Sequence, residues 1–190
     1  MKRWLISLAL LGTICPAIAD WHAIGDTSSI YAVSIKSTHL AELHQFTIHS
    51  AQLTDTGNFT LKVELASVLS GAEHRNQLLQ DVLFEVAKYP LVELSTTLSM
   101  DWLAELPIAT VTSLGIDAQL ALHGITQPLA LSLHIVKLSE SQFWVTNAQP
   151  VLLDLTEFGY QKGLQKLTKL SNLDSISTAV PLTFSLLMSK

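Results

Sequence analysis

Seven histidines are the side chains in this sequence best suited to metal or acid–base chemistry, and His39, His44 and His49 recur every five residues. This spacing places successive side chains on opposite faces of a strand, or about 140° apart on a helix, so no regular structure brings the three together. We therefore expect no metal site. We interpret the imidazoles as exposed to solvent or hydrogen-bonded within the core.

Catalytic chemistry has no local motif in this chain. The sequence lacks the G-x-S-x-G, H-E-x-x-H, C-x-x-C, G-x-G-x-x-G and Walker A patterns, which mark nucleophilic, metal, redox and nucleotide sites. We therefore expect neither an enzyme nor a cofactor. A dispersed Ser-His-Asp set stays open, because such a set is recognised by its geometry and not by its spacing in sequence.

Two groups of polar residues are candidates for contact with an anionic headgroup or surface. Arg75 and Asn76 open a predicted helix, where unpaired backbone N–H groups and the positive end of the helix dipole lie. Lys162, Lys166 and Lys169 share one side of a second predicted helix, which could meet an anionic membrane surface. The simpler interpretations are an exposed ion pair for Arg75 and a solvated helix face for the lysines.

The first 19 residues have the features of a cleaved secretory signal. Lys2 and Arg3 precede an apolar run over residues 4–14 that is too short to span a bilayer, and residues 17–19 (Ala-Ile-Ala) suit a signal peptidase. We expect cleavage after this segment and a periplasmic location. Cys15 is the only cysteine, so the mature chain is expected to contain no disulfide.

The composition favours a protein with much apolar surface to bury. Without Lys2 and Arg3 the mature chain has 9 basic residues against 16 acidic ones, and this negative charge disfavours a nucleic-acid partner. Charged residues make up 14% of the chain, against about 25% in ordinary soluble proteins. We therefore expect residues 20–190 to form a single domain with a large core or a cavity.

The longest alternating pattern lies between residues 114 and 136. Apolar side chains recur at every second position on both sides of a breaker segment, residues 123–128, which contains Gly124 and Pro128. A period of two is typical of a strand with one face away from water, so this segment predicts a long antiparallel hairpin. The residues expected to face inward, one of them from the final strand, are Ile116, Leu120, Leu131, Leu133 and Phe184. Those expected to face outward are Asp117, Gln119 and Ser132.

Shorter patterns predict further strands and two helices. Tyr31, Val33 and Ile35 alternate with polar or small neighbours, and a mostly polar link over residues 38–45 follows. Stripes of helical period interrupt the strands at residues 73–89 and from about residue 157, and residues 101–112 are expected to be irregular. The predicted strands are residues 29–36, 46–53, 59–65, 91–98, 114–122, 129–136, 143–153 and 176–187.

About eight antiparallel strands with one or two inserted helices predict a mainly β fold. An antiparallel barrel is the expected architecture, because closure removes the exposed edges of a sheet. The interior of an eight-stranded barrel can be filled by its own side chains or can hold a small ligand. The alternation by itself therefore leaves both a filled core and a cavity open.

Three segments resemble the YceI family of bacterial periplasmic proteins. The first is residues 83–90, Leu-Phe-Glu-Val-Ala-Lys-Tyr-Pro, at the end of the helix that opens with Arg75 and Asn76. The others are the Leu-His-Gly-Ile-Thr-Gln-Pro turn of residues 122–128 and the strand over residues 176–184. The sequence after Arg75 departs from the Arg-Asp-x-His-Leu pattern of many members, which indicates a variant branch.

This resemblance implies a lipocalin-like barrel whose apolar interior holds an isoprenoid chain, such as a polyprenyl lipid or an isoprenoid quinone. We therefore expect a non-enzymatic periplasmic carrier, for which transient membrane contact and a homodimer stay open. The alternatives are an enzyme acting on a small apolar compound and a structural or stress-protective protein with a filled core. The expected ligand-binding residues are Phe46, Phe59, Leu61, Val63, Arg75, Asn76, Leu83, Leu94, Ile116, Leu120, Leu131, Leu133 and Phe184.

Overall fold

The computed structural model describes residues 20–190, and the predicted signal segment lies outside the described residues. Ten antiparallel strands form one sheet. They are β1 (Trp21–Ala23), β2 (Ser29–Lys36), β3 (Leu40–Leu53), β4 (Asn58–Leu69), β5 (Leu91–Thr97), β6 (Val111–Leu122), β7 (Ile125–Ser139), β8 (Gln142–Asn147), β9 (Val151–Asp154) and β10 (Ala179–Ser189). The helical segments are η1 (Gly25–Thr27), α1 (Glu73–Leu78), η2 (Leu79–Phe84), α2 (Met100–Glu105), η3 (Leu155–Phe158) and α3 (Gln161–Leu170).

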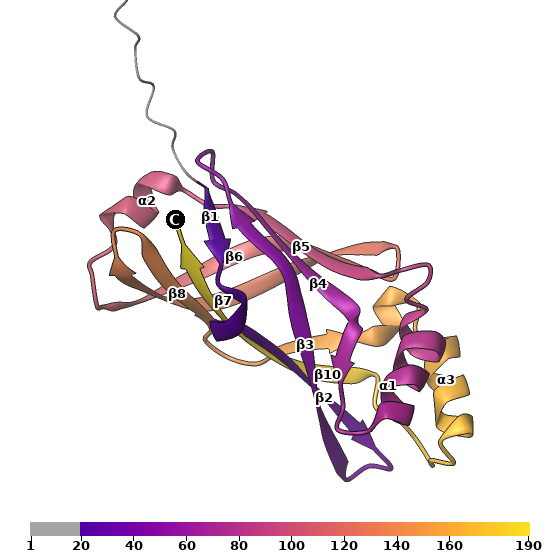
Figure 1. Cartoon of the computed structure of the whole chain (residues 1–190). Coiled ribbons are helices and arrows are strands. Elements are labelled where there is room, and N and C mark those ends of the chain that lie inside the picture. Colours follow the sequence, from indigo (N-terminus) through magenta and orange to yellow (C-terminus); the bar gives the residue numbers. More distant parts are fainter. Residues whose placement is uncertain (1–19) are drawn as a thin grey trace, which may run out of the picture.

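The sheet closes into a ring, which confirms the predicted mainly β barrel. Strands β2 to β8 pair in sequence order, and β10 joins the two ends of this series by pairing with β2 and with β8. The short strands complete the seam, because β9 pairs with β10, and β1 bridges β10 and β3. Figure 1 shows the strands wrapped around a common interior.

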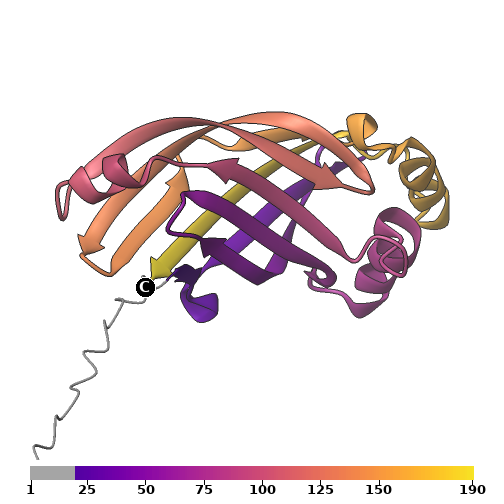
Figure 2. The ribbon, with the colours of Figure 1, turned by 90° about the horizontal axis from the view of Figure 1, so that it is seen from above.

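Helices lie at both ends of the barrel (Figures 1 and 2). At one end, called here the helical end, α3 packs on η2, and Leu164 and Leu167 are buried together with Leu79 and Leu83. At the opposite end, called the α2 end, Leu103 belongs to a second buried cluster that includes Trp21 and Met188. Among residues 20–190, no helix is both long and apolar enough to cross a bilayer.

The central hairpin has a much tighter turn than the sequence predicts. Strands β6 and β7 are joined by His123 and Gly124 alone, with φ angles of 53° and 77°, which match a two-residue turn of type I′. The breaker assignment to residues 123–128 is therefore wrong, since Pro128 pairs with Gln119 inside the ladder. Proline is tolerated there because this part of β7 pairs only with β6, whereas the ladder to β8 begins at Leu133.

Strand β3 extends through the segment that the sequence assigns to a polar link. It begins at Leu40, and its polar residues pair with β2, so the link over residues 38–45 is wrong. The cavity side of β2 is formed by Ile30, Ala32, Ser34 and Lys36. The alternating apolar residues Tyr31, Val33 and Ile35 consequently lie on the outer side, because successive side chains of a strand point to opposite faces.

The helix boundaries also differ from the predicted ones. The first helix ends at Phe84, well before Pro90, because Glu85 adopts a left-handed conformation with φ of 50°. The segment predicted to be irregular contains α2, whose first turn is capped by the Ser99 hydroxyl accepting from the Trp102 N–H at 3.2 Å. The second helix begins only at Gln161, since residue 159 is a left-handed glycine that ends η3.

The last two predicted strands are shorter than expected. Residues 143–153 divide into β8 and β9 around the segment that contains Pro150, which cannot donate to a ladder. The final strand begins at Ala179, and Ile176 contributes only an isolated bridge to Lys36.

Candidate binding cavity

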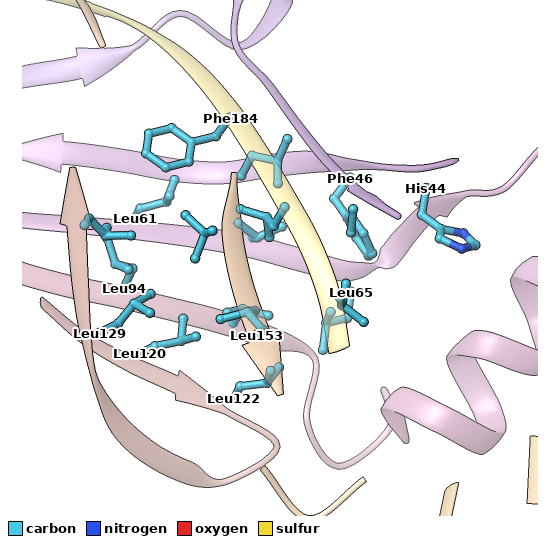
Figure 3. A pocket seen from close by; sticks show the side chains of 18 of the residues that line it. His44, Phe46, Leu61, Leu65, Leu94, Leu120, Leu122, Leu129, Leu153 and Phe184 are labelled. Atoms are coloured by element: carbon cyan, nitrogen blue, oxygen red, sulfur yellow. The ribbon is translucent and has the colours of Figure 1, made fainter. Parts of the chain in front are cut away.

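The interior of the barrel is a cavity and not a filled core. Its volume is about 240 Å³, counted as space for the centre of a water-sized sphere. One water molecule needs only about 10–15 Å³ of such space, so the cavity is large enough for a sizeable ligand. Figure 3 shows the side chains that converge on it, and most of those it labels are leucines and phenylalanines.

Most of the sequence-predicted binding residues line this cavity. Ile116 and Leu120 come from β6, Leu131 and Leu133 from β7 and Phe184 from β10. The predicted inward facing of these five residues is confirmed, and Asp117, Gln119 and Ser132 are exposed as expected. The other predicted residues that line the cavity are Phe46, Phe59, Leu61, Val63, Arg75, Leu83 and Leu94. Their contact with a ligand stays a prediction.

Asn76 is the predicted site residue that does not line the cavity. Its side chain is buried, and its Oδ1 accepts hydrogen bonds from the backbone N–H and the hydroxyl of Ser70, at 2.9 and 2.7 Å. These bonds tie the start of α1 to the end of β4. The structure therefore gives Asn76 a structural role, and its contact with a headgroup stays a prediction.

The cavity is long as well as apolar. Every second residue of β10 from Val180 to Met188 lines it. These residues span about 27 Å along the strand at about 3.4 Å per residue. The same interior is therefore lined from the helical end, where Leu164 contributes, to the α2 end, where Leu103 contributes. Such a shape suits an extended chain better than a compact molecule.

The polar lining is concentrated at the helical end. Ser34 and Lys36 come from β2, His44 from β3 and Arg75 from α1, while Ser171 and Ser177 follow α3. We call these six residues the polar end of the cavity. Sequence reasoning found only Arg75, because the apolar alternation of β2 points to the outer face and the pattern of β3 begins at Phe46. The only sequence signal for any of the other five is the polar character of residues 38–45, a feature that a link between strands also has.

A carboxylate neutralises much of the positive charge at this end. Glu42 pairs with Lys36, and its Oε1 lies 2.9 Å from the Arg75 guanidinium. Arg75 also donates to the Ser70 carbonyl at 2.7 Å, and its side chain is one third exposed. Arg75 therefore forms the partly exposed ion pair of the simpler interpretation and also lines the cavity.

His44 is the most deeply buried ionisable group at the polar end, with 6% of its surface exposed. Its Nε2 lies 2.8 Å from the Ser34 hydroxyl oxygen. Burial lowers the pKa of His44; Glu42 opposes this shift, whereas Lys36 and Arg75 reinforce it. The imidazole is consequently neutral at neutral pH.

Two of the three segments that resemble the YceI family, residues 83–90 and 122–128, meet in space. The His123 ring lies between Tyr89 and Tyr160, with centroid distances of 4.3 and 4.5 Å. Its Nε2 lies 3.2 Å from the Glu85 carboxylate, and its Nδ1 lies 3.2 Å from the Phe158 carbonyl oxygen. This arrangement fastens the β6–β7 turn to the helical end, so these motif residues position the cavity wall.

The remaining basic and histidine candidates do not converge on a site. Lys162, Lys166 and Lys169 are all exposed on α3, as expected for a solvated helix face. His39 and His49 are exposed, whereas His44 points into the barrel. In the part of the chain that the structure describes, no group of three or more His, Cys, Asp or Glu residues is placed to hold a metal ion.

Comparisons with known proteins agree with this architecture. A family model described as YceI-like domain matches residues 22–188. A polyisoprenoid binding domain from Saccharophagus degradans, implicated in plant cell wall breakdown, is similar at 29% identity with a TM-score of 0.86, covering 89% of this chain and 97% of that one. No protein with a curated description matched the sequence.

Two more distant structures share the fold. Burkholderia cenocepacia BcnA is 13% identical with a TM-score of 0.64, over 87% of this chain and 98% of that one. A Campylobacter jejuni YceI protein is 10% identical with a TM-score of 0.51, over 100% of this chain and 99% of that one.

Proposed function

This chain belongs to the YceI family, and from that premise we propose that it carries a long amphiphilic isoprenoid lipid in its barrel. The ligand is a polyprenyl lipid or an isoprenoid quinone, and the protein works in the periplasm. The observation that carries this proposal is the long apolar cavity inside a closed barrel. The similar domain from Saccharophagus degradans, which is described as polyisoprenoid binding, supports it.

The length of the cavity favours an isoprenoid over an ordinary acyl chain. The hydrocarbon core of a bilayer is about 30 Å thick and contains two opposed tails, so one phospholipid tail extends about 15 Å. The cavity-lining face of β10 extends about 27 Å, from Val180 to Met188. A polyprenyl chain of several units can follow the whole of that face, which is longer than the depth of one tail in a bilayer.

Burial of the tail supplies the binding free energy. Each buried CH₂ group contributes about 0.8 kcal/mol, so several isoprene units exceed the cost of immobilising the ligand. The lining leucines and phenylalanines have no polar side-chain atoms, so they select a ligand only by its apolar surface and its shape. The family is one of binding proteins, and we propose carriage rather than catalysis. A lipid recovered chemically unchanged after incubation is the expected result.

Native mass spectrometry of the protein purified from its own host tests this function. We expect a copurified lipid whose mass fits a polyprenyl chain, and its removal by organic extraction should leave a folded apo protein. A protein that emerges without a lipid, and that binds none when offered polyprenyl lipids or quinones, contradicts the proposal.

Leu120→Asp tests the cavity directly. Leu120 is 5% exposed and lines the cavity, so a carboxylate there meets the tail and is expected to reduce lipid binding more than tenfold. Gln119→Asp is the matched control, because Gln119 is exposed on the outer face of the same strand. Equal lipid binding by both variants, at equal thermal stability, would place the ligand elsewhere.

The periplasmic location rests on the predicted signal over residues 1–19, which lie outside the described residues. We expect a mature protein that begins at Asp20 and appears in the soluble periplasmic fraction. N-terminal sequencing of the protein from its host provides the measurement. A retained Met1 or an acylated Cys15 would contradict this part of the proposal.

A further inference from the structure

The polar end of the cavity inverts the usual arrangement of a barrel wall. Ser34 and His44 face the interior there, together with the ion-paired Lys36. On the outer side, Leu43, which pairs with Val33, is 57% exposed. Polar groups inside and apolar groups outside oppose the normal driving force of folding, and such local conflicts are typical of functional positions.

His44 has an unused hydrogen-bonding atom in this interior. Its Nε2 is paired with the Ser34 hydroxyl, whereas its Nδ1 is buried and has no partner among residues 20–190. The residue is 6% exposed and lines the cavity. Figure 3 shows it at the edge of the labelled side chains, beyond Phe46. A buried polar atom without a partner is costly, so a ligand atom that pairs with Nδ1 removes that cost.

The charges around His44 favour an uncharged ligand atom. Glu42 already pairs with both Lys36 and Arg75, and Arg75 also donates to the Ser70 carbonyl. A phosphate group would have to compete with this carboxylate for the same cations. A carbonyl accepts one hydrogen bond from the Nδ1–H of a neutral His44 whose Nε2 accepts from the Ser34 hydroxyl, and a hydroxyl head donates to Nδ1 when Nε2–H donates to Ser34.

We infer that Ser34 and His44 anchor the uncharged, oxygen-bearing head of the isoprenoid, which is a quinone carbonyl or a prenol hydroxyl. This inference rests on the proposed function and adds the chemical class and the orientation of the ligand. The head lies at the helical end, and the tail runs toward Trp21 and Met188, where the lining is apolar. The Ser34 hydroxyl adjusts to either kind of head because it both donates and accepts.

Two ligands with matched tails, one with a head and one without, separate the contribution of the head to binding from that of the tail. We would titrate wild-type protein and His44→Leu with an isoprenoid quinone and with a headless isoprenoid hydrocarbon of similar length. His44→Leu is expected to weaken quinone binding about tenfold, the effect of one hydrogen bond, and to leave hydrocarbon binding within about twofold. His44→Gln keeps an amide donor and acceptor and is expected to restore part of the quinone affinity.

Two controls keep the experiment decisive if His44→Leu folds poorly. His49→Leu changes an exposed histidine of the same strand and is expected to bind both ligands like wild type. Ser34→Ala removes only the hydroxyl that lies 2.8 Å from His44, and it is expected to weaken quinone binding selectively. Thermal unfolding of each variant identifies any loss of folding.

The outcomes distinguish this inference from the proposed function. Wild-type protein that binds neither ligand contradicts isoprenoid carriage itself. Wild-type protein that binds both, with an unchanged quinone-to-hydrocarbon ratio in His44→Leu and Ser34→Ala, overturns the anchor and leaves carriage intact. Tighter binding of a phosphorylated isoprenoid than of the quinone, lost in Arg75→Ala, also overturns it and assigns a charged head to Arg75.

Discussion

At the residue scale, His44 makes the free energy of unfolding depend on pH. Burial lowers its pKa below the ordinary value of 6.5; Glu42 opposes the shift, and Lys36 and Arg75 add to it. Because the folded-state pKa is lower than the unfolded one, the unfolded chain binds more protons below about pH 6.5. The free energy of unfolding therefore falls as the pH drops from about 6.5 toward the folded-state pKa.

Replacing His44 with glutamine should remove this part of the pH dependence. We expect the difference in the free energy of unfolding between about pH 7.5 and pH 5.5 to be smaller in His44→Gln than in wild-type protein. Urea denaturation at the two pH values provides the measurement. His49→Gln, at an exposed position, is the control and should keep the wild-type difference. An identical difference in all three proteins would show that His44 does not control this range.

At the element scale, the β6–β7 turn is held by its contact with the segment after η2. A Cβ atom on Gly124, whose φ is 77°, would lie 2.9 Å from the Tyr89 ring. Tyr89 in turn packs on His123 at a centroid distance of 4.3 Å. The turn and the segment that ends in Pro90 are therefore one structural unit, although β5, α2 and β6, within residues 91–122, separate them in sequence.

Gly124→Ala is expected to destabilise this unit. A left-handed conformation costs a residue with a Cβ about 1–2 kcal/mol, and the contact with Tyr89 adds to that cost. Gly115→Ala is the matched control on β6, since a Cβ there meets no atom within 4 Å, and its effect should stay within about 0.5 kcal/mol. Chemical denaturation compares the two variants, and equal stabilities would show that the turn is not constrained.

Helix α2 is held in place by a buried cation. Lys137 of β7 is 5% exposed, and its Nζ donates to the Ala104 carbonyl at 3.1 Å. The Glu140 carboxylate lies 3.0 Å from the same nitrogen. A cation near the last carbonyl groups of a helix is stabilising, so Lys137 holds α2 in place at this end of the barrel.

Lys137→Met keeps the aliphatic stem and removes these polar contacts. We expect a loss of about 1.5–3 kcal/mol in the free energy of unfolding, the usual contribution of a hydrogen bond from a charged group. Lys62→Met is the control, because the Lys62 side chain is 37% exposed where it pairs with Glu93 at 3.4 Å, and this pair should contribute less than about 1 kcal/mol. Unfolding in urea measures both. A gain of stability in Lys137→Met would mean that the desolvation of the cation outweighs its contacts.

At the scale of the whole molecule, the barrel leaves apolar side chains uncovered in its interior. Residues such as Phe46, Phe59, Leu94, Ile116 and Phe184 line the cavity without being fully buried. A lipid tail bound as proposed would cover this apolar surface. Folding stability and lipid binding are therefore linked, since a ligand that binds only the folded state stabilises it.

Removal of the lipid should lower the midpoint of thermal unfolding. At a free ligand concentration of 100 times Kd the stabilisation is about 2.7 kcal/mol, which corresponds to about 5–10 °C for a chain of this size. Differential scanning calorimetry of extracted and reloaded protein measures the shift. Leu120→Asp, which is expected to bind the lipid more than tenfold more weakly, should show a smaller shift on reloading. A midpoint independent of lipid in wild-type protein would contradict the linkage.

The sequence by itself determined the class of the fold and which face of several strands lines the cavity. Local period is enough for this, because a strand that closes a barrel must alternate between interior and exterior, as residues 114–122 and 180–186 do. The resemblance to the YceI family was carried by the same kind of local signal, since its turn and helix motifs are short contiguous segments. Neither inference depends on which strands are neighbours in the sheet.

The tertiary structure alone decided which end of the cavity is polar and what each polar residue does there. Ser34, Glu42, His44 and Arg75 come from β2, β3 and α1, and their contacts depend on the pairing of β2 with β3 and on the position of α1. The alternation of β2 pointed to the wrong face, because hydrophobic burial predicts the interior only where the interior is apolar. In the same way, only the folded chain shows that Ser70 already satisfies the side-chain oxygen of Asn76.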